Sequence, residues 1–411
     1  MKDIVVSLVY EVRKELENDI LPFWMSRMVD NENGGFYGQI TGEDVLCPKA
    51  SKGAILNARI LWTFSSAYRI LKNNSYLKMA SRAKEYLIGK FYDEQYGGIF
   101  WELDFKGNPA DSKKQIYAIG FAIYGLSEYV RATGDKEALE YAVKLFDVIE
   151  RYSFDSVRGG YFEAFTRDWK PIEDMRLSEK DENESKTMNT HLHVLEAYTN
   201  LYRVWKNELL KKQLAHLIDV FLHRILDKDT NHLNLFFDDN WINKYHIMSY
   251  GHDIEASWLI HEAAIVLGDK SVLGEVEAIV PRIAKAADEG LNDDGSMIYE
   301  RFVDKDVIDR ELHWWVQAEN VVGHVNLYQH YADSKALGTA SDCWKFIKDK
   351  LIDKVNGEWY WSISNDGTIN KNDDKAGFWK CPYHNSRMCM EMMEHFFQEE
   401  KDKSLWLHGH Y

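Results

Sequence analysis

Apolar residues recur at helical period in paired stretches, and a short polar turn splits each pair. The complete pairs are 53–72 with 76–91, 116–133 with 136–151, 188–205 with 208–226, 252–267 with 271–289, and 314–332 with 335–352. The stretch 3–28 has no predecessor and 384–398 has no successor, so joining them supplies a sixth pair and closes a ring. We therefore predict an all-α fold, an (α/α)6 barrel of six helix hairpins, over residues 1–411 as a single domain. An open helical solenoid is the competing architecture.

The two stretches of a pair differ in their polar faces. FAIYGLSEYV, within 116–133, is apolar or small almost all round, whereas KEALEYAVKLFDVIERY, which begins at Lys136, has a clear charged face. Helices that are apolar on every side are buried helices. We expect the first helix of each pair to lie inside the ring and the second to lie outside.

A glycine followed by alternating aromatic residues recurs between the helical pairs. GGFYG, GGIFWE, GGYFEAF, GSMIYERF and GEWYWSI contain Gly35, Gly98, Gly160, Gly295 and Gly357. Neighbouring copies are about 62 residues apart, and the longer gap after Gly160 has room for HLNLFFDDN (232–240), which keeps the alternation without the glycine. Such alternation predicts short strands, so we expect short β-hairpin loops on one rim, leading into the inner helices.

Composition excludes several classes of protein. The 411 residues include 50 Lys and Arg against 66 Asp and Glu, a formal net charge of −16, which argues against a nucleic-acid partner. No apolar run approaches the length of a membrane span, and the amphipathic start of the chain lacks a signal-peptide cleavage site. The four cysteines form no CxxC pair. We expect a cytoplasmic monomer with free thiols that binds neither nucleic acid nor membrane.

Unusual polar and aromatic side chains gather near the starts of the predicted inner helices. They are Arg59, Tyr117, Asn189, His193, His252, Glu255, Trp314, Trp315, Glu319, Trp379, His384 and Arg387. Burying polar groups without partners is costly, so these residues need a reason to be there. The barrel brings the starts of the inner helices to one rim. A funnel lined by tryptophans and hydrogen-bonding groups would suit a polyhydroxylated ligand.

Other chemistries fit the sequence less well. A zinc site would need His191, His193 and His252, but the first two are only two residues apart and point to different helix faces, and HExxH is absent. No glycine-rich phosphate loop precedes a helix, so we expect neither a metal nor a nucleotide cofactor. A glycoside hydrolase with Glu255 and Glu319 as its carboxylates stays open, as does a non-catalytic sugar-binding barrel. The histidines that we interpret as structural are His216, His223, His232, His261 and His330.

Several long motifs resemble cellobiose 2-epimerases, a group within the N-acylglucosamine 2-epimerase superfamily. The motifs are KTMNTHLHVLEAYTNLYR, SYGHDIEASWL, WWVQAE, WKCPYHNSRMCME, LPFWMSRMVDNENGGFYG and KGAILNARILW. The resemblance implies an (α/α)6 barrel and reversible epimerisation at C2 of the reducing-end glucose of β-1,4-linked disaccharides, converting cellobiose to glucosyl-mannose and lactose to epilactose, without a cofactor. The alternative on the same fold is a monosaccharide or N-acylglucosamine 2-epimerase, or an aldose–ketose isomerase.

The resemblance also implies roles for the histidines. His252 and His384 would be the two acid/base groups on opposite faces of C2, because an imidazole titrates near neutrality and can exchange roles. His193 matches a third family histidine, which would open the sugar ring or contact O1 and O5. Glu255 would orient His252 and raise its basicity.

The remaining site residues would bind the substrate. Arg59, with Asn189 and Tyr117, would stabilise charge on the enediolate oxygens. The expected stacking residues are Trp314, Trp315 and Trp379, and we assign Glu319 and Arg387 to hydrogen bonds with the sugar. Two features depart from the family pattern: Ser386 stands where glycine follows the PYHN asparagine, and the charged stretch 178–186 suggests a mobile loop over the site.

Overall fold

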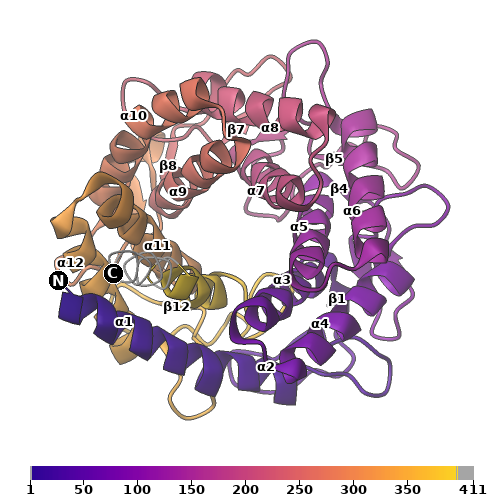
Figure 1. Cartoon of the computed structure of the whole chain (residues 1–411), viewed down its shortest axis with the longest axis horizontal. Coiled ribbons are helices and arrows are strands. Elements are labelled where there is room, and N and C mark those ends of the chain that lie inside the picture. The colour runs from indigo at the N-terminus through magenta and orange to yellow at the C-terminus, as the bar shows by residue number, and fades with distance from the viewer. Residues whose placement is uncertain (1, 395, 397–411) are drawn as a thin grey trace, which may run out of the picture.

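The computed structural model describes residues 2–394 and 396, and the helices within them form two concentric rings (Figure 1). The inner ring consists of α3 (Ala54–Leu71), α5 (Ile116–Thr133), α7 (Met188–Val204), α9 (Tyr250–Leu267), α11 (Trp314–Tyr331) and a last helix at 384–394. Consecutive inner helices pack side by side and are buried along most of their length, as the apolar pattern predicted. The (α/α)6 barrel is confirmed for the described residues, and the end of the predicted stretch 384–398 lies outside them.

The outer ring surrounds these helices, and its helices end in π-helical or 3-10 segments that the sequence did not predict. Its members are α1 (Lys2–Glu15) with α2 (Leu21–Arg27), α4 (Asn74–Tyr86), α6 (Lys136–Val148), α8 (Glu208–Val220), α10 (Lys270–Ala287) and α12 (Ser334–Phe346). Where regular helix was predicted, π-helical segments occur at Leu16–Ile20, Leu87–Phe91, Ile149–Ser153, Phe221–Ile225 and Ile347–Leu351, and a 3-10 turn at Asp288–Gly290. Each π segment begins on a buried apolar residue, so the wider turn keeps an apolar side chain in the core. No helix in the described part is both long and apolar enough to span a membrane.

Each aromatic copy of the repeat folds back on the end of the preceding outer helix. The antiparallel bridges are Val29–Phe36, Tyr92–Ile99, Phe154–Tyr161, Leu226–Leu233, Leu291–Met297 and Ile352–Trp359. The copy that lacks glycine has Asn231 at a φ of 66°, a left-handed conformation that asparagine adopts more readily than most residues. The predicted hairpins are thus confirmed, including the one at 232–240.

Short strands connect neighbouring repeats at this rim. The strands are β1 (Lys52–Gly53), β2 (Glu102–Leu103), β3 (Pro109–Asp111), β4 (Lys114–Gln115), β5 (Ala164–Phe165), β6 (Lys186–Thr187), β7 (Phe236–Phe237), β8 (Ile247–Ser249), β9 (Glu300–Phe302), β10 (Val307–Asp309), β11 (Leu312–His313) and β12 (Ser362–Ile363). The strand before each of α3, α5, α7, α9 and α11 pairs antiparallel with a strand in the later part of the next aromatic copy. This pairing fixes where the inner helices begin.

Contacts between the two ends of the chain close the ring. The Trp24 indole of α2 donates a 2.6 Å hydrogen bond to Glu358, and the Trp344 indole of α12 donates a 2.9 Å bond to Glu11 of α1. Figure 1 shows α1 lying beside α12, with the last helix between α11 and α3. The two unpaired stretches of the sequence therefore complete the sixth hairpin, and the open solenoid is wrong.

A buried lysine–aspartate pair recurs at the hairpins. The pairs are Lys52–Asp30 at 2.8 Å, Lys114–Asp93 at 2.9 Å, Lys186–Asp155 at 2.7 Å, and Lys375–Asp353. The aspartate also accepts backbone N–H bonds of the tight turn, as Asp30 does from Glu32 and Asn33. Lys52, Lys114 and Lys186 lie just before α3, α5 and α7, so each connects the start of an inner helix to the hairpin that precedes it in the chain.

We expect Lys52→Met to lower the free energy of unfolding by about 3–5 kcal/mol, because it leaves the Asp30 carboxylate buried without its cation. Denaturant titration of the two proteins measures the difference. The matched control is Lys144→Met, which removes an exposed ion pair with Glu140 and should change stability by about 1 kcal/mol or less. Equal effects of the two substitutions would contradict a structural role for the buried pair.

Candidate active site

A cavity of about 430 Å³ opens at the rim where the inner helices begin. Its lining includes ten of the twelve residues that the sequence singled out: Arg59, Tyr117, Asn189, His193, His252, Glu255, Trp314, Trp315, Trp379 and His384. The structure therefore brings together side chains from α3, α5, α7, α9, α11 and the last helix, as the barrel topology predicted. The buried Asn189 Oδ1 accepts no hydrogen bond from any residue that the structure describes, so it is available to a ligand.

Aromatic rings form one side of this cavity. The Trp315 ring lies 4.8 Å from the His252 ring and 5.7 Å from the His384 ring, measured between centroids. Trp314 packs on Trp361 at 4.6 Å, and both line the cavity. An apolar ring face is thus placed beside two imidazoles, which suits a sugar whose CH groups cover the ring while its hydroxyls face polar groups.

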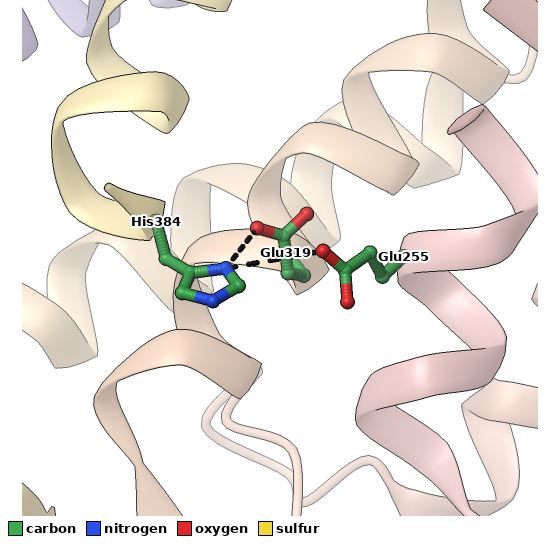
Figure 2. Close-up of side chains that lie close together, drawn as sticks. All are labelled: Glu255, Glu319 and His384. Atoms are coloured by element: carbon green, nitrogen blue, oxygen red, sulfur yellow. Dashed lines mark hydrogen bonds and ion pairs between the residues drawn. The ribbon is translucent and has the colours of Figure 1, made fainter. Parts of the chain in front are cut away.

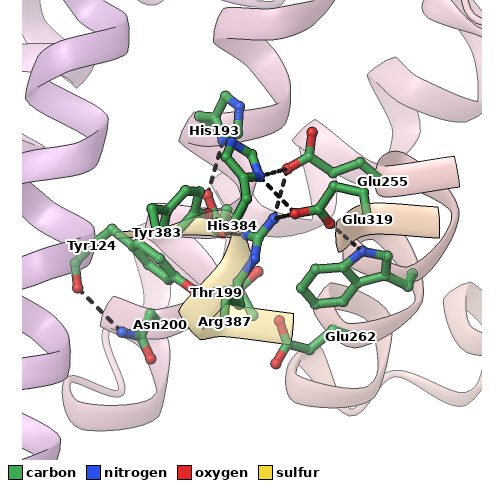
Figure 3. A network of polar contacts seen from close by, with 12 residues as sticks. Tyr124, His193, Thr199, Asn200, Glu255, Glu262, Glu319, Tyr383, His384 and Arg387 are labelled. Carbon is green, nitrogen blue, oxygen red and sulfur yellow. Dashed lines mark hydrogen bonds and ion pairs between the residues drawn. The ribbon is translucent and has the colours of Figure 1, made fainter. Parts of the chain in front are cut away.

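Two of the histidines have a carboxyl group behind them. His384 Nδ1 lies 2.7 Å from Glu319 Oε1 (Figures 2 and 3). His193 Nδ1 lies 2.9 Å from Glu196 Oε2. A carboxylate only accepts hydrogen bonds, so Nδ1 of each ring carries the proton. Nε2 is then the free nitrogen of both rings, with a lone pair that can take up a proton.

The Arg387 guanidinium connects these carboxyl groups beneath the cavity (Figure 3). One terminal nitrogen lies 2.7 Å from Glu255 Oε1 and 2.6 Å from Glu319 Oε1, and the other bonds to Glu196 Oε1. All four side chains are fully buried. Burial lowers the pKa of Arg387, but the carboxylates raise it more, so its pKa lies well above the ordinary value.

The titratable groups at the cavity have shifted pKa values. Burial lowers the pKa of His252 to about 3 and also lowers the pKa of His193. Burial with the charges of Arg59 and Arg387 holds the pKa of His384 well below its usual range. Burial and the neighbouring Glu319 raise the pKa of Glu255 to about 8. At neutral pH the imidazoles are therefore neutral, the form that accepts a proton.

Arg59 brings a positive charge to the same cavity. Its guanidinium donates a 2.9 Å hydrogen bond to the Tyr117 hydroxyl and lies 4.1 Å from the centre of the Phe121 ring. Within the described part of the chain no carboxylate pairs with it. A buried cation that lacks a counter-ion favours negative charge on a bound ligand, such as an oxyanion that forms during a reaction.

One group of side chains has the donors of a metal site. Glu255, Glu319 and His384 each place a ligand atom within 4.8 Å of the others (Figure 2). Arg387 already bridges the two carboxyl groups, so a cationic side chain occupies the position from which an ion would bind both. That no metal is needed stays a prediction.

Three predicted contacts differ in the structure. Glu319 and Arg387, which we assigned to substrate binding, lie behind the cavity wall, where they contact His384 and Glu255. Glu255, expected to orient His252, instead pairs with Arg387, and the Ser249 hydroxyl lies 2.8 Å from His252 Nδ1. Spacing alone put Glu255 and His252 on one helix face and left the rotamers undetermined.

Sequence reasoning missed the groups that support the histidines. Glu196 contacts His193, Tyr383 contacts Arg387 and Ser249 contacts His252, and the short spacing of each pair in the sequence was the available signal. The stretch 177–181 lines the cavity, so the loop expected over the site lies there. Of the predicted structural histidines, His216 accepts a bond from the Gly160 N–H and His232 contacts Asp253.

Known proteins resemble this chain over most of its length. Residues 35–387 match the family described as N-acylglucosamine 2-epimerase (GlcNAc 2-epimerase). The chain is 62% identical over 386 residues to the cellobiose 2-epimerase of Bacteroides fragilis, covering 94% of this chain and 98% of that protein. It is 44% identical over 391 residues to the cellobiose 2-epimerase of Ruminococcus albus, with coverage of 94% and 98%. The structure of the cellobiose 2-epimerase from Bacillus thermoamylovorans superimposes with a TM-score of 0.90 at 44% identity, over 94% of this chain and 99% of that one.

The fold and the cavity define an (α/α)6-barrel protein whose site combines neutral histidines with buried carboxyl groups. Sequence and structure comparisons agree with that class over nearly the whole chain. The chain belongs to the N-acylglucosamine 2-epimerase family.

Proposed function

We propose that the protein catalyses reversible epimerisation at C2 of the reducing-end glucose of β-1,4-linked disaccharides such as cellobiose and lactose. The observation that carries this proposal is the pair of neutral imidazoles of His252 and His384, whose rings lie 4.8 Å and 5.7 Å from the Trp315 ring at the cavity. The close relatives are named cellobiose 2-epimerases, which supports the same substrate class here. No cofactor is needed for this chemistry.

The geometry supports a two-base mechanism. In the open-chain sugar, one histidine takes the C2 proton at Nε2, and the electron pair of the broken C–H bond forms the C1–C2 double bond of a cis-enediolate. Arg59 and the Tyr117 hydroxyl stabilise the negative oxygens. The second histidine, which has taken up a proton from solvent at Nε2, then returns that proton to the opposite face of C2, and the first histidine releases its proton to solvent. His193, held by Glu196, is placed to assist ring opening.

The cavity has room for a second sugar unit. Besides the predicted site residues, its lining includes Leu177, the stretch 178–181, Tyr299, His313 and Trp361. These side chains offer ring faces and polar groups, the mixture that binds sugars. This extended lining favours a disaccharide over the monosaccharide and N-acylglucosamine alternatives.

The carboxyl geometry disfavours a glycoside hydrolase. Hydrolysis needs two carboxyl groups that flank the scissile bond. Glu255 and Glu319 instead meet at the same nitrogen of Arg387, and Glu319 is not part of the cavity lining. The pair therefore serves the neighbouring histidines.

The test is incubation of the protein with cellobiose in D2O, followed by NMR. We expect glucosyl-mannose to form with deuterium at C2, and no free glucose to appear. Lactose, glucose and N-acetylglucosamine are tested in parallel, and the disaccharides should react fastest. Absence of C2 exchange with every aldose would contradict the proposed chemistry, and preferential turnover of a monosaccharide would contradict the substrate class.

We further propose a cytoplasmic monomer. The described cysteines are all free, and Cys343, Cys381 and Cys389 are buried, which suits a reducing compartment. The closed ring buries its own helices without a second copy. Sedimentation analysis of the purified protein distinguishes a monomer from a dimer.

A further inference from the structure

The Ser249 hydroxyl holds one of the two proposed bases. Ser249 is 1% exposed, and its Oγ lies 2.8 Å from His252 Nδ1. The residue ends β8, which pairs with β9, so the backbone at Ser249 is fixed opposite Glu300. Ser249 is absent from the cavity lining, so a bound sugar is contacted by His252 and not by the serine.

This hydroxyl is not used to cap the helix that follows it. Ser249 is the residue before α9, where a serine side chain usually accepts a backbone N–H of the first turn, but no such bond forms. At the same position before α7, Thr187 does accept the Thr190 N–H, at 3.1 Å. The Ser249 hydroxyl therefore contacts His252 instead of capping α9.

The three cavity histidines consequently differ in what lies behind Nδ1. His193 and His384 face carboxyl groups, Glu196 and Glu319, whereas His252 faces an uncharged hydroxyl. A carboxylate stabilises an imidazolium much more than a hydroxyl does, because the bond becomes charged at both ends. The protonated form of His252 is therefore stabilised less by its Nδ1 partner than the protonated form of His384 is.

We propose, on the basis of the epimerisation proposed above, that Ser249 is a positioning residue that orients His252 and makes it the stronger proton donor of the His252–His384 pair. The Nδ1–H group donates to Ser249 Oγ, so Nε2 is the nitrogen that exchanges protons with C2. When C2–H breaks, its proton moves to Nε2 of the accepting histidine and its electron pair forms the enediolate. Before His252 donates, it takes up a proton from solvent at Nε2; that proton and the electron pair of the enediolate then make the new C2–H bond, and His252 returns to the neutral Nδ1–H form.

Two charged or titratable groups besides Ser249 shift the pKa of His252, and a third, Glu255, lies nearby on the same helix. His193 on α7 lowers its pKa, Glu319 on α11 raises it, and Glu255 lies one turn further along α9. None of these is changed by a substitution at Ser249. A shift in the pH profile of a Ser249 variant can therefore be assigned to the hydroxyl.

The experiment compares Ser249→Ala, Ser249→Asp and Ser249→Thr in the full chain with cellobiose. We expect Ser249→Ala to lower kcat about 10- to 100-fold with KM little changed, which is the usual effect of removing the partner that orients a histidine. One limb of the pH profile should move to lower pH in Ser249→Ala and to higher pH in Ser249→Asp. Ser249→Thr keeps the hydroxyl and should keep the parent profile.

The control for a purely structural effect is Asn207→Ala. Asn207 caps the outer helix α8 by accepting the N–H groups of Leu209 and Leu210, and it lies outside the cavity. This variant should lower Tm and leave the pH profile unchanged. A Ser249→Ala variant that behaves in the same way, or retains full kcat, would overturn the inference.

A measurement without substrate separates this inference from the proposed function. The 15N NMR signals of His252 report which ring nitrogen carries the proton. We expect Nδ1–H in the parent and Ser249→Thr, and a mixture of tautomers in Ser249→Ala. An unchanged tautomer in Ser249→Ala overturns the positioning role even if epimerisation is confirmed. Failure of the parent to exchange C2 protons overturns the proposed function, while the tautomer result still tests the contact.

Discussion

His384→Asn should lower kcat/KM for cellobiose epimerisation by about 100- to 10,000-fold, the range for loss of a general acid or base. Asparagine keeps a donor for Glu319 but has no nitrogen that accepts a proton at neutral pH. His252 remains, so we expect the variant still to exchange the C2 proton of one epimer in D2O. Steady-state kinetics and NMR of each separate epimer give the two readings.

A neutral histidine elsewhere provides the control for this variant. His216→Asn changes a half-buried ring that contacts the Gly160 N–H at the outer side of the barrel, and it should leave kcat/KM within about two-fold, as expected for a residue that touches no reacting group. If His384→Asn exchanges both epimers equally and still interconverts them, a single base performs the reaction. The two-base mechanism would then be wrong.

Arg387→Met should lower the free energy of unfolding by about 3–5 kcal/mol or more, because three fully buried carboxyl groups lose their shared cation. Methionine fills a similar volume, so the loss of charge dominates over the loss of packing. Activity should disappear as well, since Glu319 and Glu196 would no longer be held against His384 and His193. Thermal unfolding and epimerisation assays measure the two effects.

The destabilisation should depend on pH with a definite sign. Without Arg387 the pKa of Glu196, which this cation lowers, should rise, and the pKa of Glu255, already raised by burial to about 8, should rise further. The folded protein then binds more protons than the unfolded chain, so stability is lost as pH rises. The difference in Tm between parent and Arg387→Met should widen from pH 5 to pH 8. A further Glu255→Gln substitution should recover part of the loss, and a constant difference across this range would contradict the electrostatic explanation.

The sequence predicted the architecture because two separate patterns in it, one of helices and one of aromatic residues, repeat along the chain. The alternation of buried and amphipathic helices located the inner and outer rings, and the aromatic copies located the hairpins, including the one at Asn231. The π-helical ends of the outer helices were not predictable from periodicity. One extra residue in a final turn changes the hydrogen bonding without changing which face is apolar.

The sequence predicted the members of the site better than their partners. Topology was sufficient to place His252, His384 and Arg59 at one rim, because each lies near the start of an inner helix. Which carboxyl group meets which histidine depends on rotamers and on distances between helices that are far apart in the chain. For that reason the contacts of Glu319 and Arg387 beneath the cavity, and of Ser249 with His252, emerged only from the structure.

Because the ring closes with its last helix, the candidate site is completed only after nearly the whole chain has been synthesised. Trp24 meets Glu358 across 334 residues, so the N-terminal helices leave the ribosome long before their partners exist. Contacts this distant in sequence form slowly during folding. His384 and Arg387 belong to the last helix of the ring, so a growing chain carries most of the barrel while it still lacks one base and the cation beneath the cavity. On the proposed mechanism, a chain released before its last helix is complete has no epimerase activity, however much of its barrel has folded.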